Sequence, residues 1–256
     1  MKYDLGVIGT GEFAVHLVNG FMFNNPKLTA ILSPRNEKCA ARLSKQYGHK
    51  IAANNQEVVS SCKFVLLAML PSQLTDALKE LVWDEDQIII SVVTGISVEE
   101  LNNIVSPAQS VICMPTNSAM IGKSILPVYP HHTEAEKFLS ALGKPVALPD
   151  EKAFESCAVL GATYGWLLAL KAGTTQWLCD NNVPEQEARE LMAELFMSVG
   201  EISQHRNDVS ISTLANELRL PGGITEHGLT LFEESGALEQ WQKVMGAILD
   251  RLSVRY

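Results

Sequence analysis

The fold of this chain is decided by residues 2–14, which read Lys-Tyr-Asp-Leu-Gly-Val-Ile-Gly-Thr-Gly-Glu-Phe-Ala. The apolar run 5–8 predicts a buried strand, and apolar residues at helical spacing from Phe13 to Phe21 predict a helix after it. Between them, Gly9, Gly11 and Ala14 match the G-x-G-x-x-G/A spacing of dinucleotide-binding turns. The chain therefore opens with a strand, a tight glycine turn and a helix.

Each small residue of this turn has a physical role. Gly9 permits the sharp turn, Gly11 lets the backbone approach a pyrophosphate, and Ala14 lets the helix pack closely on the strand. The free N–H groups of the first helical turn then face the phosphates. A purely structural glycine turn is the alternative, but the strand and helix around it favour cofactor binding. The predicted contacts are Gly9, Thr10, Gly11, Glu12, Phe13 and Ala14.

The segment after the second predicted strand, residues 28–32, indicates which dinucleotide binds. An NAD enzyme carries Asp or Glu about 20 residues past the glycines, where it binds the ribose hydroxyls. This chain instead reads Ser33-Pro34-Arg35-Asn36. A guanidinium offers a fork of donors that matches phosphate oxygens, so Arg35 with Ser33 favours NADPH over NADH, although Arg35 as a solvated loop cation is the alternative.

Composition places the chain among ordinary globular proteins. Of its 256 residues, 46% are hydrophobic and 19% are charged, and the net charge is −9. The acidic balance and the lack of a basic cluster argue against a nucleic-acid or anionic-membrane partner. No signal region is recognised, and the apolar residues 158–172 are shorter than a membrane span of about 20 residues. We therefore expect a cytoplasmic protein.

Cysteines and histidines give no sign of a metal site. The five cysteines are widely spaced and never form C-x-x-C, which predicts reduced thiols rather than disulfides or zinc ligands. His131 and His132 have no acidic or thiol partner at ligand spacing, so a solvated turn is predicted there.

The first 150 residues alternate between strands and helices. Strand candidates are residues 5–8, 28–32, 51, 64–68, 88–93, 111–114, 125–129 and 146–148, and helix candidates are residues 38–47, 55–60, 72–81, 98–104 and 134–142. This alternation predicts parallel βαβ units, and hence an α/β fold with a doubly wound Rossmann domain over residues 1–150.

Residues 151–256 are predicted to form an all-α domain. From Ala153 onward no convincing strand occurs, and apolar residues recur every three or four positions, as they do from Leu238 to Leu252. These apolar faces exceed what about 100 residues need internally, which predicts a homodimer or higher homo-oligomer; a core that covers itself is the alternative.

The loop 220–227, Leu-Pro-Gly-Gly-Ile-Thr-Glu-His, precedes a helix predicted over 229–234. Backbone N–H groups and the Thr225 hydroxyl at a helix start form a site suited to a small carboxylate or an imine nitrogen. An ordinary helix cap by Thr225 or a neighbouring residue explains the same residues equally well.

Together these motifs resemble the pyrroline-5-carboxylate reductase family over nearly the whole chain. The resemblance is carried by residues 6–14, Ser33 and Arg35, Asn55, Leu67-Ala68-Met69-Leu70-Pro71, Val93-Thr94-Gly95-Ile96-Ser97, Met114-Pro115-Thr116-Asn117-Ser118-Ala119 and Pro221-Gly222-Gly223. It implies an NADPH-binding domain joined to a helical dimerisation domain, and the reduction of 1-pyrroline-5-carboxylate to L-proline in proline biosynthesis.

The resemblance also implies where ligands bind. NADPH would contact residues 9–14, Ser33, Arg35 and Asn55, with the nicotinamide near Ala68, Met69, Pro71, Thr94 and Gly95. Substrate would lie near Asn117, Gly222, Gly223 and Thr225, in a site completed by the other subunit, with Thr225 bonding the ring nitrogen.

The chain departs from the family pattern on the substrate side. Leu70 stands where the family usually has lysine, Leu160 and Leu220 stand where it has serine, and Glu226 stands where it has an aliphatic residue. A buried site that loses hydrogen-bond partners discriminates strongly against its original ligand. Three functions therefore remain open: a pyrroline-5-carboxylate reductase, a reductase of another imine or carbonyl, and a catalytically silent NADP-binding regulatory protein.

Overall fold

The computed structural model describes residues 2–253 of the chain. The chain divides into two compact units, of which the second comprises Ala162–Ile248. The first unit runs to Gly161 and resumes at Leu249, so it also includes the end of the last helix. Each unit is described below by itself.

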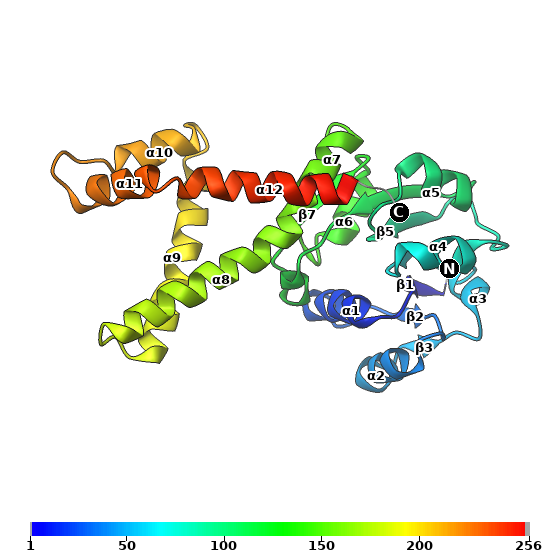
Figure 1. Cartoon of the computed structure of the whole chain (residues 1–256). Helices are drawn as coiled ribbons and strands as arrows, with labels where there is room; N and C mark the ends of the chain where they lie inside the picture. The colour runs from blue at the N-terminus through cyan, green and yellow to red at the C-terminus, as the bar shows by residue number, and fades with distance from the viewer. Residues whose placement is uncertain (1, 254–256) are drawn as a thin grey trace. The chain divides into compact units, whose positions relative to one another are not determined.

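The first unit is built on one eight-stranded sheet (Figure 1). Its strands are β1 (Tyr3–Ile8), β2 (Ala30–Leu32), β3 (Lys50–Ile51), β4 (Cys62–Leu67), β5 (Ile88–Ser91), β6 (Gln109–Cys113), β7 (Ser124–Tyr129) and β8 (Gly143–Ala147). They lie in the order β3-β2-β1-β4-β5-β6-β7-β8. Every strand candidate from the sequence is present, with ends shifted by a few residues.

Helices cover both faces of this sheet, as a doubly wound fold requires. They are α1 (Glu12–Asn24), α2 (Glu37–Tyr47), α3 (Asn55–Val59), α4 (Pro71–Leu78), α5 (Val98–Val105) and α6 (Thr133–Leu139). Leu66 packs into the core with α1, α2 and α6, whereas its neighbours Val65 and Leu67 pack with α3, α4 and α5. Alternate strand residues point to opposite faces, so one strand contributes to both cores.

The sheet is mixed rather than wholly parallel, which corrects the expectation of parallel units throughout. Strand β7 runs antiparallel to β6, with Ile112 opposite Tyr129 and Cys113 opposite Val128, while the other neighbouring pairs are parallel. The connection 114–123 contains only the 3₁₀-helix η1 (Asn117–Ile121). A parallel crossover needs about a dozen residues or more, so this short connection reverses the chain direction.

Helix α7 (Glu151–Cys157) packs on the sheet unit, although the predicted boundary assigned it to the helical domain. Phe154 is buried in the core beside α4 and α5. The backbone N–H of Val98 donates to Glu151 Oε1 at 3.0 Å. These contacts extend the first unit beyond residue 150, because the apolar side of α7 completes one core of the sheet.

The second unit is helical, as the sequence predicts. Its helices are α8 (Val159–Asp180), α9 (Glu185–His205), α10 (Ile211–Glu217), α11 (Ile224–Glu234) and α12 (Ala237–Ser253), the first and last of which continue into the first unit. Trp166 and Trp241 make an edge-to-face contact with ring centroids 5.5 Å apart. The expected apolar face of α9 is present, but Leu195, Val199 and Ile202 are at least half exposed.

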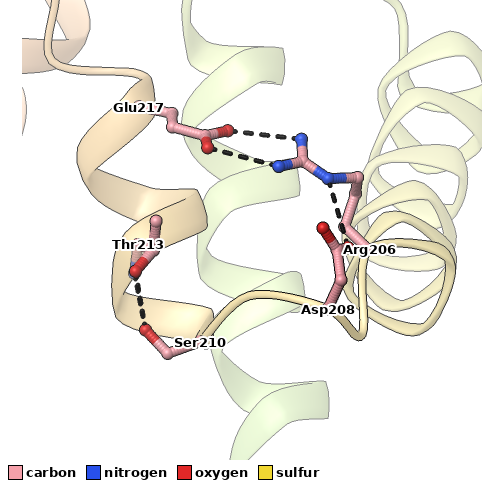
Figure 2. A network of polar contacts seen from close by, with 5 residues as sticks. All are labelled: Arg206, Asp208, Ser210, Thr213 and Glu217. Atoms are coloured by element: carbon pink, nitrogen blue, oxygen red, sulfur yellow. Dashed lines mark hydrogen bonds and ion pairs between the residues drawn. The ribbon is translucent and has the colours of Figure 1, made fainter.

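A polar network fixes the turn from α9 into α10 (Figure 2). The guanidinium of Arg206 makes two contacts with Glu217, at 3.3 and 3.4 Å, and its Nε lies 3.6 Å from Asp208. Ser210 caps α10 by accepting a hydrogen bond from the N–H of Thr213 at 3.1 Å. Glu217 holds the pKa of Arg206 above its usual value. This exposed network sets the direction of α10 rather than adding much stability.

One helical stretch, Glu151–Asp180, is long and apolar enough to cross a membrane by length and composition alone. The apolar residues 158–172 are fewer than a span needs, but the helical stretch that contains them is 30 residues long, so length does not exclude a span, contrary to the expectation from the sequence. The core helix of a soluble protein meets the same criteria. The absence of a membrane partner therefore stays a prediction.

Gly20 allows α1 to touch η1, and this contact can be tested. A Cβ at Gly20 would lie 2.0 Å from the carbonyl oxygen of Ala119. We expect Gly20→Ala to lower the free energy of unfolding by about 1–3 kcal/mol, because backbone must move to make room. Urea unfolding of this variant measures the loss, with Gly11→Ala as control, since a Cβ at Gly11 meets nothing within 4 Å. Equal midpoints for the two variants would contradict the prediction.

Candidate active site

The site lies where the strand order of the sheet reverses. From β1 the chain moves outward to β2 and β3 and then crosses back to β4 on the other side of β1. In open α/β sheets the crevice at the carboxyl ends of such strands is where ligands bind. A pocket of about 730 Å³ opens there, and it is lined by residues that follow β1, β2, β4 and β5.

The glycine turn has the geometry that its spacing predicts. Gly9 has φ +91°, and a Cβ there would lie 2.7 Å from the carbonyl oxygen of Ala68, so the turn packs directly on the end of β4. The N–H of Gly11 donates to the carbonyl of Gly9 at 2.8 Å. Gly11 itself leaves open space where a side chain would stand. That space is the cradle that a pyrophosphate needs.

Helix α1 begins at this cradle without a side-chain cap. The N–H groups of Glu12, Phe13 and Ala14 belong to its first turn and have no acceptor within the helix. They give the pocket a positive helix end suited to phosphate. The residues present therefore fit a dinucleotide pyrophosphate.

Hydrogen bonds that involve Thr10 and Ser33 fix the conformation of the glycine turn. The N–H of Gly9 donates to Ser33 Oγ at 3.1 Å, and Thr10 Oγ1 donates to the Ser33 carbonyl at 3.1 Å. Both side chains are buried. Ser33 thus positions the glycine turn, and its direct contact with a 2′-phosphate stays a prediction.

Arg35 lies at the rim of the same pocket with Asn36. Asn36 caps α2, because its Oδ1 accepts from the N–H of Cys39 at 3.2 Å. Within residues 2–253 no hydrogen bond or ion pair engages the exposed Arg35 guanidinium. A free cation beside a helix start is suited to a phosphate at the ribose end of the pocket.

Glu12 brings a negative charge to the mouth of the cradle, and neighbouring groups partly neutralise it. Arg42 Nη2 lies 2.6 Å from Glu12 Oε2, and Cys39 Sγ donates to Glu12 Oε1 at 3.4 Å. The hydrogen bonds from Arg42 and then Cys39 hold the pKa of Glu12 below its ordinary value. Glu12 is therefore ionised and turned toward α2.

The residues predicted for the nicotinamide divide between two cavities. Ala68 and Met69 line the large pocket, while Thr94 and Gly95 line a second cavity of about 220 Å³ in the same unit. Val92 lines both. Pro71 is the first residue of α4 and sets the start of that helix after β4.

Asn55 and Asn117 are among the predicted residues that line neither of these cavities. Asn55 donates to the carbonyl of Ala77 at 3.0 Å, so its side chain joins α3 to the end of α4. Asn117 begins η1 and is exposed. Gln73 lines the large pocket and was not predicted. Its position two residues after Pro71, in the first turn of the helix that follows β4, is the signal that could have found it.

Two of the buried cysteines, Cys62 and Cys113, are poorly suited to act as nucleophiles. All five cysteines are free. Burial raises the pKa of Cys62 and of Cys113 to about 12, so both thiols stay protonated near neutral pH. Within residues 2–253 no group of three or more His, Cys, Asp or Glu side chains is placed to hold a metal ion.

The loop before α11 forms a separate candidate site in the helical unit. Helix α11 begins five residues earlier than predicted, so Gly223 is its N-cap and Thr225 lies in its first turn. Of the ordinary caps considered, Thr225 is therefore excluded, and the cap position belongs to its neighbour Gly223, which offers no side chain. Gly222 has φ +76°, and the Thr225 side chain is exposed. The substrate roles of Gly222, Gly223 and Thr225 stay predictions.

Each of the two units matches a family model of known oxidoreductases. Residues 4–95 match the family model described as NADP oxidoreductase coenzyme F420-dependent. Residues 151–254 match the model for pyrroline-5-carboxylate reductase dimerisation. The fold and the dinucleotide pocket therefore define an oxidoreductase that uses a nicotinamide cofactor.

Whole-chain comparisons find several pyrroline-5-carboxylate reductases. A pyrroline-5-carboxylate reductase of Haemophilus influenzae is 24% identical over 96% of this chain and 95% of its own length. The crystal structure of the enzyme from Streptococcus pyogenes covers 98% of each chain with a TM-score of 0.82 at 20% identity. That of Plasmodium falciparum pyrroline carboxylate reductase with NADP bound has a TM-score of 0.81 at 16% identity, covering 98% of this chain and 97% of that one. The chain is thus similar over nearly its whole length to pyrroline-5-carboxylate reductases, and residues 151–254 match their dimerisation domain.

The two glycines of the turn should respond differently to the same substitution. Gly9→Ala adds a Cβ against β4 at a left-handed φ, so we expect it to destabilise the fold by about 1–3 kcal/mol. Gly11→Ala fills only the cradle, so we expect a stable protein whose NADPH affinity falls at least tenfold. Thermal unfolding and fluorescence titration with NADPH separate the two effects. Normal cofactor affinity in Gly11→Ala would refute the placement of the pyrophosphate.

Glu12 should weaken cofactor binding, and Arg42 should limit that effect. We expect Glu12→Gln to lower the NADPH dissociation constant a few-fold and Arg42→Ala to raise it, because phosphate and carboxylate repel each other. Both changes should shrink in high salt, since the pair is exposed. NADPH titrations at low and high ionic strength measure this, with Glu99→Gln as a charge-matched control, because Glu99 is exposed on α5 and does not line the pocket. An equal response from Glu99→Gln would show that only net charge matters.

Proposed function

We propose that this protein reduces a cyclic imine with NADPH, and that 1-pyrroline-5-carboxylate, reduced to L-proline, is the reaction to test first. The observation that carries the proposal is the uncapped start of α1 beside the unpaired Arg35, in one pocket at the switch point of the sheet. Similarity to pyrroline-5-carboxylate reductases supplies the reaction type.

The protein's part in this reaction is chiefly orientation. The N–H groups that begin α1 hold the pyrophosphate, Arg35 holds the 2′-phosphate, and Ala68 and Met69 border the nicotinamide end. NADPH, when bound, supplies the hydride that the electrophilic carbon of C=N accepts. Positioning of the two reactants contributes several kcal/mol, about 7–11 at best, and no protein nucleophile is needed.

Thr225 is the residue we assign to the substrate nitrogen. Its hydroxyl is exposed in the first turn of α11. As the carbon gains hydride, the nitrogen gains a proton from solvent and becomes an amine, and the hydroxyl is able to hydrogen-bond that nitrogen. We propose Thr225 as a catalytic residue in this limited sense, with Gly222 and Gly223 shaping the loop that presents it.

The active form is proposed to be a homodimer. Helices α10 and α11 bury no residue within the described part of a single chain, and α9 buries only Ala188 and Met192. Large apolar side chains, such as that of Trp177, which is 62% exposed, are unfavourable in contact with water and mark a surface that another protein surface covers. The match of residues 151–254 to a dimerisation model supports a second copy as that cover.

A second candidate function follows from the altered loop. Leu220 and Glu226 remove a hydroxyl and add a charge where the family binds substrate. A catalytically silent NADP-binding protein would bind cofactor without turnover of any imine. Tight NADPH binding with no turnover of any cyclic imine would favour this second function.

The proposal is tested by following NADPH oxidation with 1-pyrroline-5-carboxylate. We expect turnover that prefers NADPH to NADH, and Arg35→Ala should raise KM for NADPH about tenfold or more, because it removes charge-assisted hydrogen bonds to the 2′-phosphate. KM for NADH should stay unchanged. Lys45→Ala, an exposed cation on α2, is the control. Equal losses with both cofactors would contradict the role of Arg35, and no turnover would contradict the proposed reaction.

A further inference from the structure

The loop 218–223 between α10 and α11 carries two groups that bind anions well, and both are already engaged. The N–H of Gly222 donates to Glu226 Oε2 at 2.8 Å. The guanidinium of Arg219 pairs with Glu233. Both carboxylates belong to α11, so this helix neutralises the loop that precedes it.

The rest of the loop leaves little for an incoming carboxylate to use. The N–H of Gly223 donates to the carbonyl of Leu220 at 2.8 Å. Arg219 is three-quarters buried, with Nε unpaired inside and Nη2 on Glu233, so it is fixed in its present direction. A ligand carboxylate reaching Gly222 must displace Glu226 and face its negative charge.

We infer that Glu226 is a specificity-determining residue that disfavours a carboxylate on the substrate. This inference rests on the proposed function, because it concerns the loop to which the imine is assigned. The charge of Glu226 shifts the preference of the chain between two kinds of cyclic imine. It favours an imine that lacks a carboxylate over one that carries it, compared with the same protein without this charge. A ring without a carboxylate does not require the N–H of Gly222 as a donor. The hydrogen bond from Gly222 to Glu226 therefore stays intact when such a ring binds, and the ring nitrogen can still contact Thr225.

The experiment compares two imines that differ only in the carboxylate, 1-pyrroline-5-carboxylate and 1-pyrroline, with saturating NADPH. The readout is the ratio of their kcat/KM values. We expect Glu226→Ala to raise this ratio about tenfold through a lower KM for the carboxylate substrate, and Glu226→Gln to raise it less, because an amide oxygen still accepts from Gly222. KM for 1-pyrroline should not move.

Glu234→Gln is the matched control, because it removes one negative charge from the same helix at an exposed position. An unchanged ratio in both Glu226 variants, or the same change in Glu234→Gln, would overturn the inference. Thermal unfolding of each variant shows whether α11 is retained, and Glu226→Gln serves if Glu226→Ala is unstable.

A binding measurement separates this inference from the proposed function. L-Proline, which carries the carboxylate, is titrated by calorimetry into protein saturated with NADP⁺. If the unaltered protein reduces neither imine but Glu226→Ala binds L-proline about tenfold more tightly, the inference stands and the proposed function fails. If the affinity for L-proline does not change, the inference fails whatever the turnover.

Discussion

The first unit depends on one close approach, that of the Gly9 turn to the end of β4. No Cβ fits at Gly9, because the carbonyl of Ala68 occupies the place where it would stand. This contact brings β1 and β4 together at the point where the chain reverses its direction across the sheet. The same contact directs the start of α1 into the crevice. The absence of a side chain at Gly9 is therefore needed both for packing against β4 and for forming the dinucleotide pocket.

In the described part of the chain, some arginine side chains of this acidic protein are paired with a carboxylate, and others are not. Arg35 has no partner within residues 2–253, whereas Arg42 is paired with Glu12 and Arg219 with Glu233. An unpaired cation at the dinucleotide pocket and a paired one in the loop 218–223 indicate opposite preferences for anions. The dinucleotide pocket and the loop 218–223 thus differ in their electrostatic character. The net charge of −9, which is a property of the whole chain, does not reveal this difference.

The two units also differ in how they reach stability. The sheet unit buries two apolar cores of its own, one on each face. The helical unit leaves large apolar side chains exposed along α8, α9 and α11. Burial of apolar surface is the dominant favourable term in folding, so the helical unit, taken by itself, gains less from burial than the sheet unit does.

Local sequence was sufficient for the strands, for the helices of the first 150 residues and for the glycine turn, because hydrophobic period and glycine spacing act over a few positions. The turn at Gly9, with φ +91°, is an example. Family resemblance rested on the order of these local pieces. Tertiary structure decided what depends on distant partners: the reversed β7, the transfer of α7 to the sheet unit, and the burial of Ser33 behind the turn. It also decided that Glu226 bonds to Gly222, since that contact depends on where α11 begins.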